Sequence, residues 1–137
     1  MPIIQWTDKF SIGDAELDAQ HRIWISIYNK AHDRMMDPDE TNFQSTGLDA
    51  LIEMQEYGQT HFASEEAYME RIAYPKIDAH KMMHDRFSRE INLLIHDLKA
   101  GKFVLNSEVI KRIENWLTHH ILKEDVKIRD FTAQAGS

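Results

Sequence analysis

The sequence predicts an all-α protein, an antiparallel up-down-up-down four-helix bundle with an N-terminal extended arm. Apolar residues recur with a period near 3.6 residues, whereas the alternating pattern of strands is scarce. The chain has only three prolines and five glycines, and they fall mostly between the helical patterns. Four helices of about 20 residues joined by short loops pack most simply as antiparallel neighbours.

The first predicted helix follows the turn at Gly13 and Asp14, and the Asp14 side chain can cap its first backbone N–H groups. It ends near Asp37, because Pro38 cannot continue a helix. Its inward face carries His21. The arm that precedes it is expected to be extended.

The second predicted helix begins between Thr41 and Leu48 and runs to about Ile72. Its end is marked by Tyr74 and Pro75, since the residue before a proline is biased away from the helical conformation. The third helix covers about 76–100.

Gly101 supplies the stop for the third helix, because glycine readily adopts the left-handed conformation found at helix C-termini. The fourth helix begins near an Asn106-Ser107 cap and runs past Ile128. Each of the four helices then carries at least one side chain able to bind a metal ion.

Length and cysteine content limit the kind of protein. The 137 residues fall within the usual range for one domain, so a single domain over 1–137 is expected. There is no cysteine, which excludes disulfides, iron–sulfur clusters, thiolate-bound zinc and cysteine nucleophiles. Any metal must therefore be held by nitrogen and oxygen.

Charge and hydropathy limit the partners. The 16 Lys and Arg against 23 Asp and Glu give a formal net charge of -7, which offers no electrostatic reason to expect nucleic acid or an anionic membrane surface. The N-terminus lacks a basic region followed by a long apolar stretch, and no apolar run approaches the roughly 20 residues that span a bilayer. We expect no membrane insertion and a cytoplasmic location.

Seven side chains on the four predicted helices form the candidate metal site. His61 and Glu65 are four residues apart. His80 and His84 share that spacing, and helical residues four apart lie on one face with adjacent side chains, so each pair can chelate one ion. The full set is His21, His61, Glu65, His80, His84, His120 and Asp125.

The spacing of His120 and Asp125 is less regular. They are five residues apart, which places them roughly 140° from each other on an ideal helix. Either the aspartate reaches sideways, or the helix loosens locally in a π-type bulge. Glu66 points off the metal face and is expected to be solvated or to contact a ligand from behind. His32, His96 and His119 are left out of the ligand set.

Imidazole and carboxylate ligands together suit non-haem iron. Two octahedral irons offer about twelve positions, of which the imidazoles fill about five, two bridging carboxylates about four and an oxo or hydroxo bridge about two. One position remains for dioxygen. A lone His21 on an apolar face would more commonly be a core histidine, and either i, i+4 pair alone is a weak signal. The joint register of all seven favours metal binding.

Four stretches of the chain resemble bacterial hemerythrins. They are Asp18-Ala19-Gln20-His21, His61-Phe62-Ala63-Ser64-Glu65-Glu66, Tyr74-Pro75 with His80 and His84, and Trp116-Leu117-Thr118-His119-His120-Ile121 ending at Asp125. The resemblance extends from about Trp6 to Phe131. It implies a cofactor of two Fe ions per chain, Fe(II) or Fe(III), with an oxo or hydroxo bridge.

The resemblance also implies ligand roles. The residues that would bind the coordinatively saturated iron are His80, His84 and His120. His21 and His61 would bind the iron that takes oxygen. The bridging residues would be Glu65 and Asp125, and the walls of the oxygen pocket would be Phe62 and Leu117, with Trp24 and Ile25 as further candidates.

The expected function is reversible dioxygen binding for storage, transport or delivery, and not enzymatic turnover. The expected partners are dioxygen and an oxygen-consuming enzyme, with the chain a monomer or weak oligomer.

One alternative is a di-iron oxidase or ferroxidase, although such bundles typically use Glu-x-x-His pairs, which are missing from the proposed site. Another is sensing of oxygen, redox state or iron through a partner protein. A single zinc ion would use about four ligands and leave the rest unused.

Overall fold

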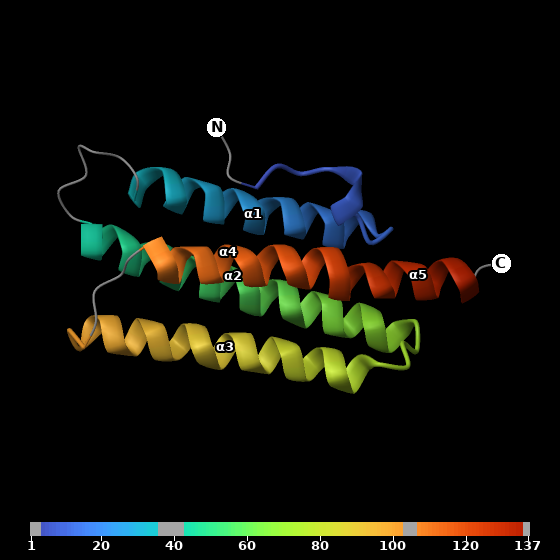
Figure 1. Cartoon of the computed structure of the whole chain (residues 1–137). Helices are drawn as coiled ribbons and strands as arrows, with labels where there is room; N and C mark the ends of the chain where they lie inside the picture. Colours follow the sequence, from blue (N-terminus) through green and yellow to red (C-terminus); the bar gives the residue numbers. More distant parts are fainter. Residues whose placement is uncertain (1–3, 36–42, 103–106, 136–137) are drawn as a thin grey trace.

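The computed structural model describes residues 4–35, 43–102 and 107–135, and in these ranges every regular element is helical. The helices are α1 (Ala15–Met35), α2 (Phe43–Arg71), α3 (Ile77–Lys99), α4 (Ser107–His119), the π-helical segment η2 (His120–Asp125) and α5 (Val126–Ala135). Figure 1 shows α4, η2 and α5 as one continuous rod and successive rods running in opposite directions. The predicted up-down-up-down bundle is confirmed.

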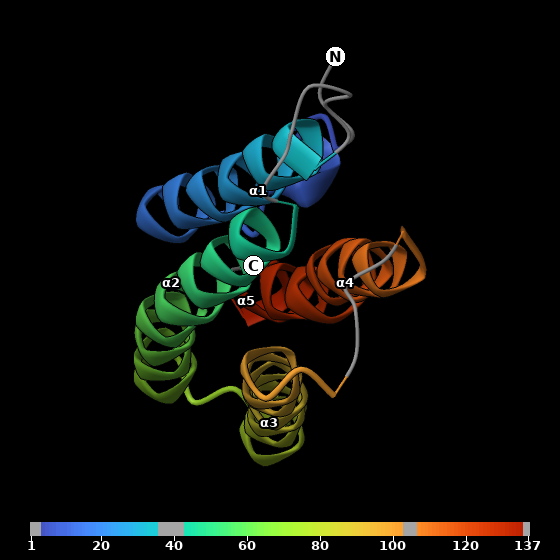
Figure 2. The same cartoon turned by 90° about the vertical axis from the view of Figure 1, so that its left-hand side faces the viewer.

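The four rods surround a common interior, as the end-on view in Figure 2 shows. α1 packs against α2, α2 packs against α3, and α4 lies beside α1. Between α3 and α4 lies an open groove of about 640 Å³, with Phe87, Ile91 and Trp116 among its lining residues. The rods therefore pack more closely on the α1–α2–α3 side than on the α3–α4 side.

The N-terminal arm is fastened along α1. The side chain of Asn29 accepts a hydrogen bond from the Ile4 backbone N–H at 3.0 Å and donates one to the Ile4 carbonyl at 2.8 Å. A short 3₁₀ turn, η1 (Asp8–Phe10), interrupts the arm and buries the Phe10 ring. The backbone is extended on both sides of η1, at Thr7 and Ser11, and the arm adds Ile4 and Phe10 to the buried apolar cluster.

The start of α1 agrees with the predicted cap. Asp14 accepts a hydrogen bond from the Leu17 backbone N–H at 3.0 Å, which satisfies one of the free donors at the helix start. The predicted end near Asp37, the stop at Pro38 and the Thr41 boundary of the second helix lie outside the described residues. So does Asn106 of the predicted fourth-helix cap.

The end of α2 differs in detail from the prediction. The helix ends at Arg71, and Ala73 follows in the left-handed region with φ of 56°. Hydrogen bonds from the Tyr74 N–H to the Met69 carbonyl at 2.9 Å, and from the Ala73 N–H to the Glu70 carbonyl at 3.1 Å, complete a Schellman motif. The chain therefore turns before the proline. Gly101, with φ of 71°, ends α3 in the same way, as predicted.

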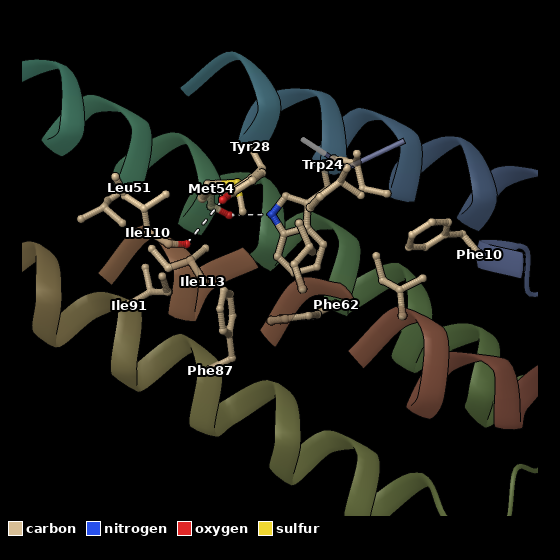
Figure 3. Close-up of a cluster of buried hydrophobic side chains, with 14 residues drawn as sticks. Phe10, Trp24, Tyr28, Leu51, Met54, Phe62, Phe87, Ile91, Ile110 and Ile113 are labelled. Carbon is tan, nitrogen blue, oxygen red and sulfur yellow. Dashed lines mark hydrogen bonds between the residues drawn. The ribbon is translucent and has the colours of Figure 1, made fainter. Parts of the chain in front are cut away.

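The larger of two buried apolar clusters among the described residues fills the bundle interior from the metal-ligand candidates toward the start of α2, and the smaller one contains Met69, Tyr74 and Ile128. Figure 3 shows side chains from all four rods meeting there, with Trp24 donating to the Met54 carbonyl at 3.1 Å. Tyr28 likewise donates to the Ile110 carbonyl at 3.4 Å. These bonds satisfy the polar atoms of two large buried side chains and join α1 to α2 and α4. A helix with the length and hydropathy of a membrane span is not found among the described residues.

Ala73 provides a test of the turn. Because the left-handed conformation costs a non-glycine residue roughly 1–2 kcal/mol, Ala73→Gly should stabilise the chain. The greater freedom of glycine in the unfolded state offsets part of this, so we expect a gain of about 0.5–1 kcal/mol in urea unfolding of chelator-treated protein.

The matched control for this change is Ala67→Gly, at an exposed position inside α2. It should destabilise the chain by roughly 0.5–1 kcal/mol, since the backbone there is helical. Equal losses in the two variants would contradict the proposed strain at Ala73.

Candidate metal centre

The structure brings all seven predicted ligand side chains together in the bundle interior. α1 contributes one, α2 two, α3 two and η2 two. None is more than 2% exposed, although all seven are polar or ionisable. The set comprises His21, His61, Glu65, His80, His84, His120 and Asp125, and every imidazole presents its Nε2 atom to a carboxylate.

The first cluster, which we call the three-histidine group, consists of His80, His84 and His120 with one oxygen from each carboxylate. Glu65 Oε1 lies 2.7 Å from His80 Nε2 and 3.1 Å from His84 Nε2. Asp125 Oδ1 lies 2.9 Å from His80 Nε2 and 3.0 Å from His120 Nε2.

The second cluster, the two-histidine group, consists of His21 and His61 with the other oxygen of each carboxylate. Glu65 Oε2 lies 3.1 Å from His61 Nε2 and 3.4 Å from His21 Nε2. Asp125 Oδ2 lies 3.0 Å from His21 Nε2. Both carboxylates thus stand between the groups and offer one oxygen atom to each, which is the arrangement a bridging ligand needs.

The π-helical segment explains how two donors five residues apart serve one site. In η2 the backbone hydrogen bonds span five residues instead of four, so a turn contains more residues and His120 and Asp125 come to the same side of the rod. Their 3.0 Å contact is the result. Of the two routes left open by the sequence, local loosening of the helix is confirmed.

Several polar atoms in the centre lack a hydrogen bond, although they are buried. Nε2 of His21 and His61, Oε2 of Glu65 and both oxygens of Asp125 have no partner of suitable geometry among the described residues. In addition, Nε2 of His84 lies 3.2 Å from Nε2 of His120. Leaving such atoms unpaired in an apolar interior is costly. Cations placed in the two groups would satisfy them, and the nitrogen and oxygen donors suit a non-haem iron.

The imidazoles respond differently to the buried carboxylates. Burial acts to lower the pKa of His21 and His80, but contacts and charge interactions with Asp125 and Glu65 exceed that effect and raise the two values to about 9 and about 10. Against burial, the charge of Asp125 and contacts with both carboxylates raise the pKa of His120 to about 8. These three imidazoles therefore hold a proton more strongly than usual, and a cation that binds at their nitrogen atoms must displace that proton.

His61 and the carboxylates shift the other way. Burial lowers the pKa of His61, and the nearby charge of Glu65 does not compensate. Burial also acts to raise the pKa of Glu65 and Asp125, but the surrounding imidazoles lower both values well below the usual carboxyl range. The two carboxylates are therefore ionised and ready to bind a cation.

Three side chains outside the donor set contact the imidazole rings, two at Nδ1 and one on a ring face. His61 Nδ1 donates to Gln20 Oε1 at 2.9 Å. His120 stacks on Trp116, with ring centroids 4.6 Å apart and planes 8° apart. The sequence left Glu66 as either solvated or behind a ligand. In the structure its carboxylate accepts a hydrogen bond from His84 Nδ1 at 2.9 Å. The helical positions of Gln20 and Trp116 alone gave no signal, because such contacts depend on the neighbouring rod.

The predicted pocket walls are all buried. Phe62 stacks on His84 with centroids 3.9 Å apart, and Trp24 lies 5.5 Å from the His61 ring. Ile25 and Leu117 are 3% and 0% exposed and belong to the same core cluster. Each lies about one helical turn from a candidate ligand on its own helix.

The three histidines left out of the ligand set lie away from the centre. The side chain of His96 is 71% exposed, and His119 is also exposed. His32 is partly buried and lies near Asp33, with its Nδ1 4.0 Å from Oδ1. None of the three belongs to either cluster of potential metal donors.

The shifted pKa values predict how stability depends on pH when no cation is bound. The three imidazoles with raised pKa contribute fully below their usual value of 6.5, and this contribution is lost as pH rises through about 8 to 10. Glu65 and Asp125 contribute to folding stability at pH values above their usual carboxyl pKa, and His61 contributes above pH 6.5. Because the folded chain lowers all three pKa values, these contributions are lost in acid and stability falls there too. The urea midpoint of chelator-treated protein should peak near pH 6.5 and decline toward pH 10.

Metal binding should show the opposite trend, because donor imidazoles must lose their protons. Apparent affinity should rise from pH 6 to pH 9, with release of protons to the buffer. A urea midpoint of the chelated chain that rises or stays level between pH 7 and pH 10 would contradict the assigned contacts.

Comparison with known proteins agrees with this geometry. A family model described as the hemerythrin HHE cation binding domain matches residues 13–129. The bacteriohemerythrin of Ralstonia nicotianae is 31% identical over 139 residues, covering 99% of this chain and 93% of that protein. The bacteriohemerythrin of Clostridium acetobutylicum is 29% identical over 123 residues, covering 88% of this chain and 94% of that protein.

Solved structures show the same relationship. The crystal structure of wild-type hemerythrin superposes with a TM-score of 0.81 at 28% identity, covering 90% of this chain and 93% of that one. A hemerythrin variant with a leucine replaced by alanine gives a TM-score of 0.82, covering 92% and 94%. The fold, the clustered donors and the matched sequence all lead to one conclusion: the chain belongs to the hemerythrin family.

Proposed function

We propose that this chain binds dioxygen reversibly at a non-haem di-iron centre, for oxygen storage, transport or delivery. The observation that carries the proposal is the position of Glu65 and Asp125, each of which directs one oxygen to the three-histidine group and the other to the two-histidine group. Two cations sharing both carboxylates fit this arrangement. A pair of ferrous ions would supply the two electrons that reversible dioxygen binding needs.

The unequal donor count indicates where dioxygen would be accommodated. The three-histidine group offers His80, His84 and His120, whereas the two-histidine group offers one imidazole fewer beside the same carboxylates. A cation in the three-histidine group would have more of its positions filled by protein. The position left over therefore belongs to the two-histidine group, between α1 and α2.

The surroundings of the centre support binding without turnover. Trp24 and Phe62 are buried against the imidazoles, and Figure 3 shows both rings pointing into the bundle interior. Gly58 makes room for Trp24, since a Cβ at that position would lie 3.1 Å from the indole Cζ2. Apolar walls of this kind exclude water and limit proton entry, which would otherwise promote irreversible oxidation of the iron.

The main alternatives are an oxidase or ferroxidase, and a sensor that acts through a partner protein. The nitrogen-rich donor set favours a carrier over an oxidase, because di-iron enzymes of helical bundles typically use more carboxylates. We therefore propose a binding protein and not an enzyme. An oxygen-consuming enzyme is the partner we propose for delivery.

The decisive test is a cycle of oxygen addition and removal. The chelated chain would be loaded anaerobically with ferrous iron, and iron per chain counted. We expect two irons per chain and a visible charge-transfer band that appears with oxygen and disappears when oxygen is withdrawn, over repeated cycles. Consumption of oxygen with no recovery of the ferrous spectrum would favour the oxidase.

The control for the iron count is Asp125→Ala, which removes a shared ligand from both groups. This variant should hold fewer than two irons per chain. Full loading with two irons would contradict the bridging role that we propose for the carboxylate.

Leu117→Ala tests the apolar wall. The residue is completely buried, so the change should leave a cavity and cost about 2–5 kcal/mol of stability. Because water can then approach the centre more easily, the iron-loaded variant should oxidise to the ferric form several-fold faster in air. Phe62→Ala should act in the same direction.

The matched control is Leu122→Ala on the same rod, where the leucine is 36% exposed. Its autoxidation rate, followed by the loss of the oxygen-dependent band, should equal that of the unmodified chain. Unchanged rates in both Leu117→Ala and Phe62→Ala would remove this account of the pocket.

A further inference from the structure

Two of the five imidazoles are held from behind by side chains of different charge. His84 Nδ1 donates to the Glu66 carboxylate at 2.9 Å, and His61 Nδ1 donates to the Gln20 amide oxygen at the same distance. The first ring belongs to the three-histidine group and the second to the two-histidine group. One half of the centre therefore has an anionic acceptor behind a ring, and the other half has a neutral one.

The contact behind His84 is well placed to fix that ring. Its imidazole is only 1% exposed, while the side chain of Glu66 is 28% exposed, so the carboxylate closes the site from the bundle surface. Phe62 stacks on the same ring with planes 11° apart. The two contacts set the ring plane and place the proton on Nδ1, which leaves the Nε2 lone pair for a cation.

The contact behind His61 has a comparable geometry but a different chemistry. The Gln20 side chain joins α1 to α2 twice, because its amide nitrogen also donates to Ser64 Oγ at 3.1 Å. This second bond directs the amide oxygen toward the ring. The ring again presents Nε2 to the centre, but nothing in the contact adds negative charge.

Charge behind a ring changes its strength as a ligand. A carboxylate attracts the Nδ1 proton more strongly than an amide oxygen does, so the imidazole gains anionic character and its Nε2 becomes a stronger donor. A neutral acceptor fixes the tautomer with a smaller effect on basicity. The difference in acceptors thus acts in the same direction as the difference in donor number.

We propose that Glu66 is a positioning residue that strengthens the three-histidine group, and that Gln20 is its neutral counterpart, so that the two halves of the centre bind cations with unequal affinity. The three-histidine group fills first and holds its ion firmly. The two-histidine group binds its ion more weakly, because its donors are fewer and less basic. This is also the group at which we propose that dioxygen binds. This inference rests on the two-cation centre of the proposed function.

The test is an anaerobic titration of the chelated chain with Co(II), whose visible spectrum reports its ligands. The unmodified chain should take up two ions in two resolved steps. Glu66→Gln gives both rings the same kind of acceptor, so it should weaken the first step by about 10–100-fold and shift the spectrum of that step. Gln20→Glu is the reciprocal change and should strengthen the second step, bringing the two affinities closer together.

Two measurements separate this effect from a loss of structure. The matched control is Glu53→Gln, which removes the same charge at an exposed position about 20 Å along α2 and should change neither step. The urea midpoint of the chelated Glu66→Gln chain should stay close to that of the unmodified chain, because glutamine still accepts the ring proton.

Three results would overturn the inference. They are an unchanged first step and spectrum in Glu66→Gln, an equal loss in both steps, or a loss fully matched by lower stability of the chelated chain. Two ions in the unmodified chain together with an unaffected Glu66→Gln would overturn this inference alone. Uptake of a single ion by the unmodified chain would overturn the two-cation centre itself.

Discussion

The need to match buried ionisable side chains with positive charge is the constraint on which this structure depends. Five imidazoles and two carboxylates lie at the centre of the bundle with almost no exposure, and several of their donor atoms lack hydrogen bonds among the described residues. In an apolar interior such a set is unfavourable unless cations bind it. Metal affinity and the stability of the bundle are therefore two aspects of one equilibrium.

The same constraint governs the helices. The donor side chains of all four rods must lie at the same height along the bundle axis. The lengths of the rods and the turns between them therefore determine whether the site can form. The Schellman turn at Ala73 places the start of α3 so that His80 and His84 reach Glu65. The π-helical segment η2 adds the extra residue that lets Asp125 join His120. Local departures from ideal geometry thus occur where donor register requires them.

Most of the fold and the donor set could be predicted from the sequence, because helical spacing fixes which residues share a face. The pair His80 and His84 needed only the i, i+4 rule. From the sequence, the π-helical segment η2 could be named only as one of two options. The change from α- to π-helical hydrogen bonding can occur at several positions of a helix without a change in composition. Gln20 and Trp116 were not predicted, because their contacts depend on how neighbouring rods pack.

The most direct test of a centre with two cations is anomalous X-ray diffraction at the iron absorption edge from iron-loaded crystals. We expect two anomalous peaks per chain, one beside Nε2 of His80, His84 and His120 and the other beside Nε2 of His21 and His61, with both carboxylates between them. A single peak, or two peaks that share neither carboxylate, would contradict it.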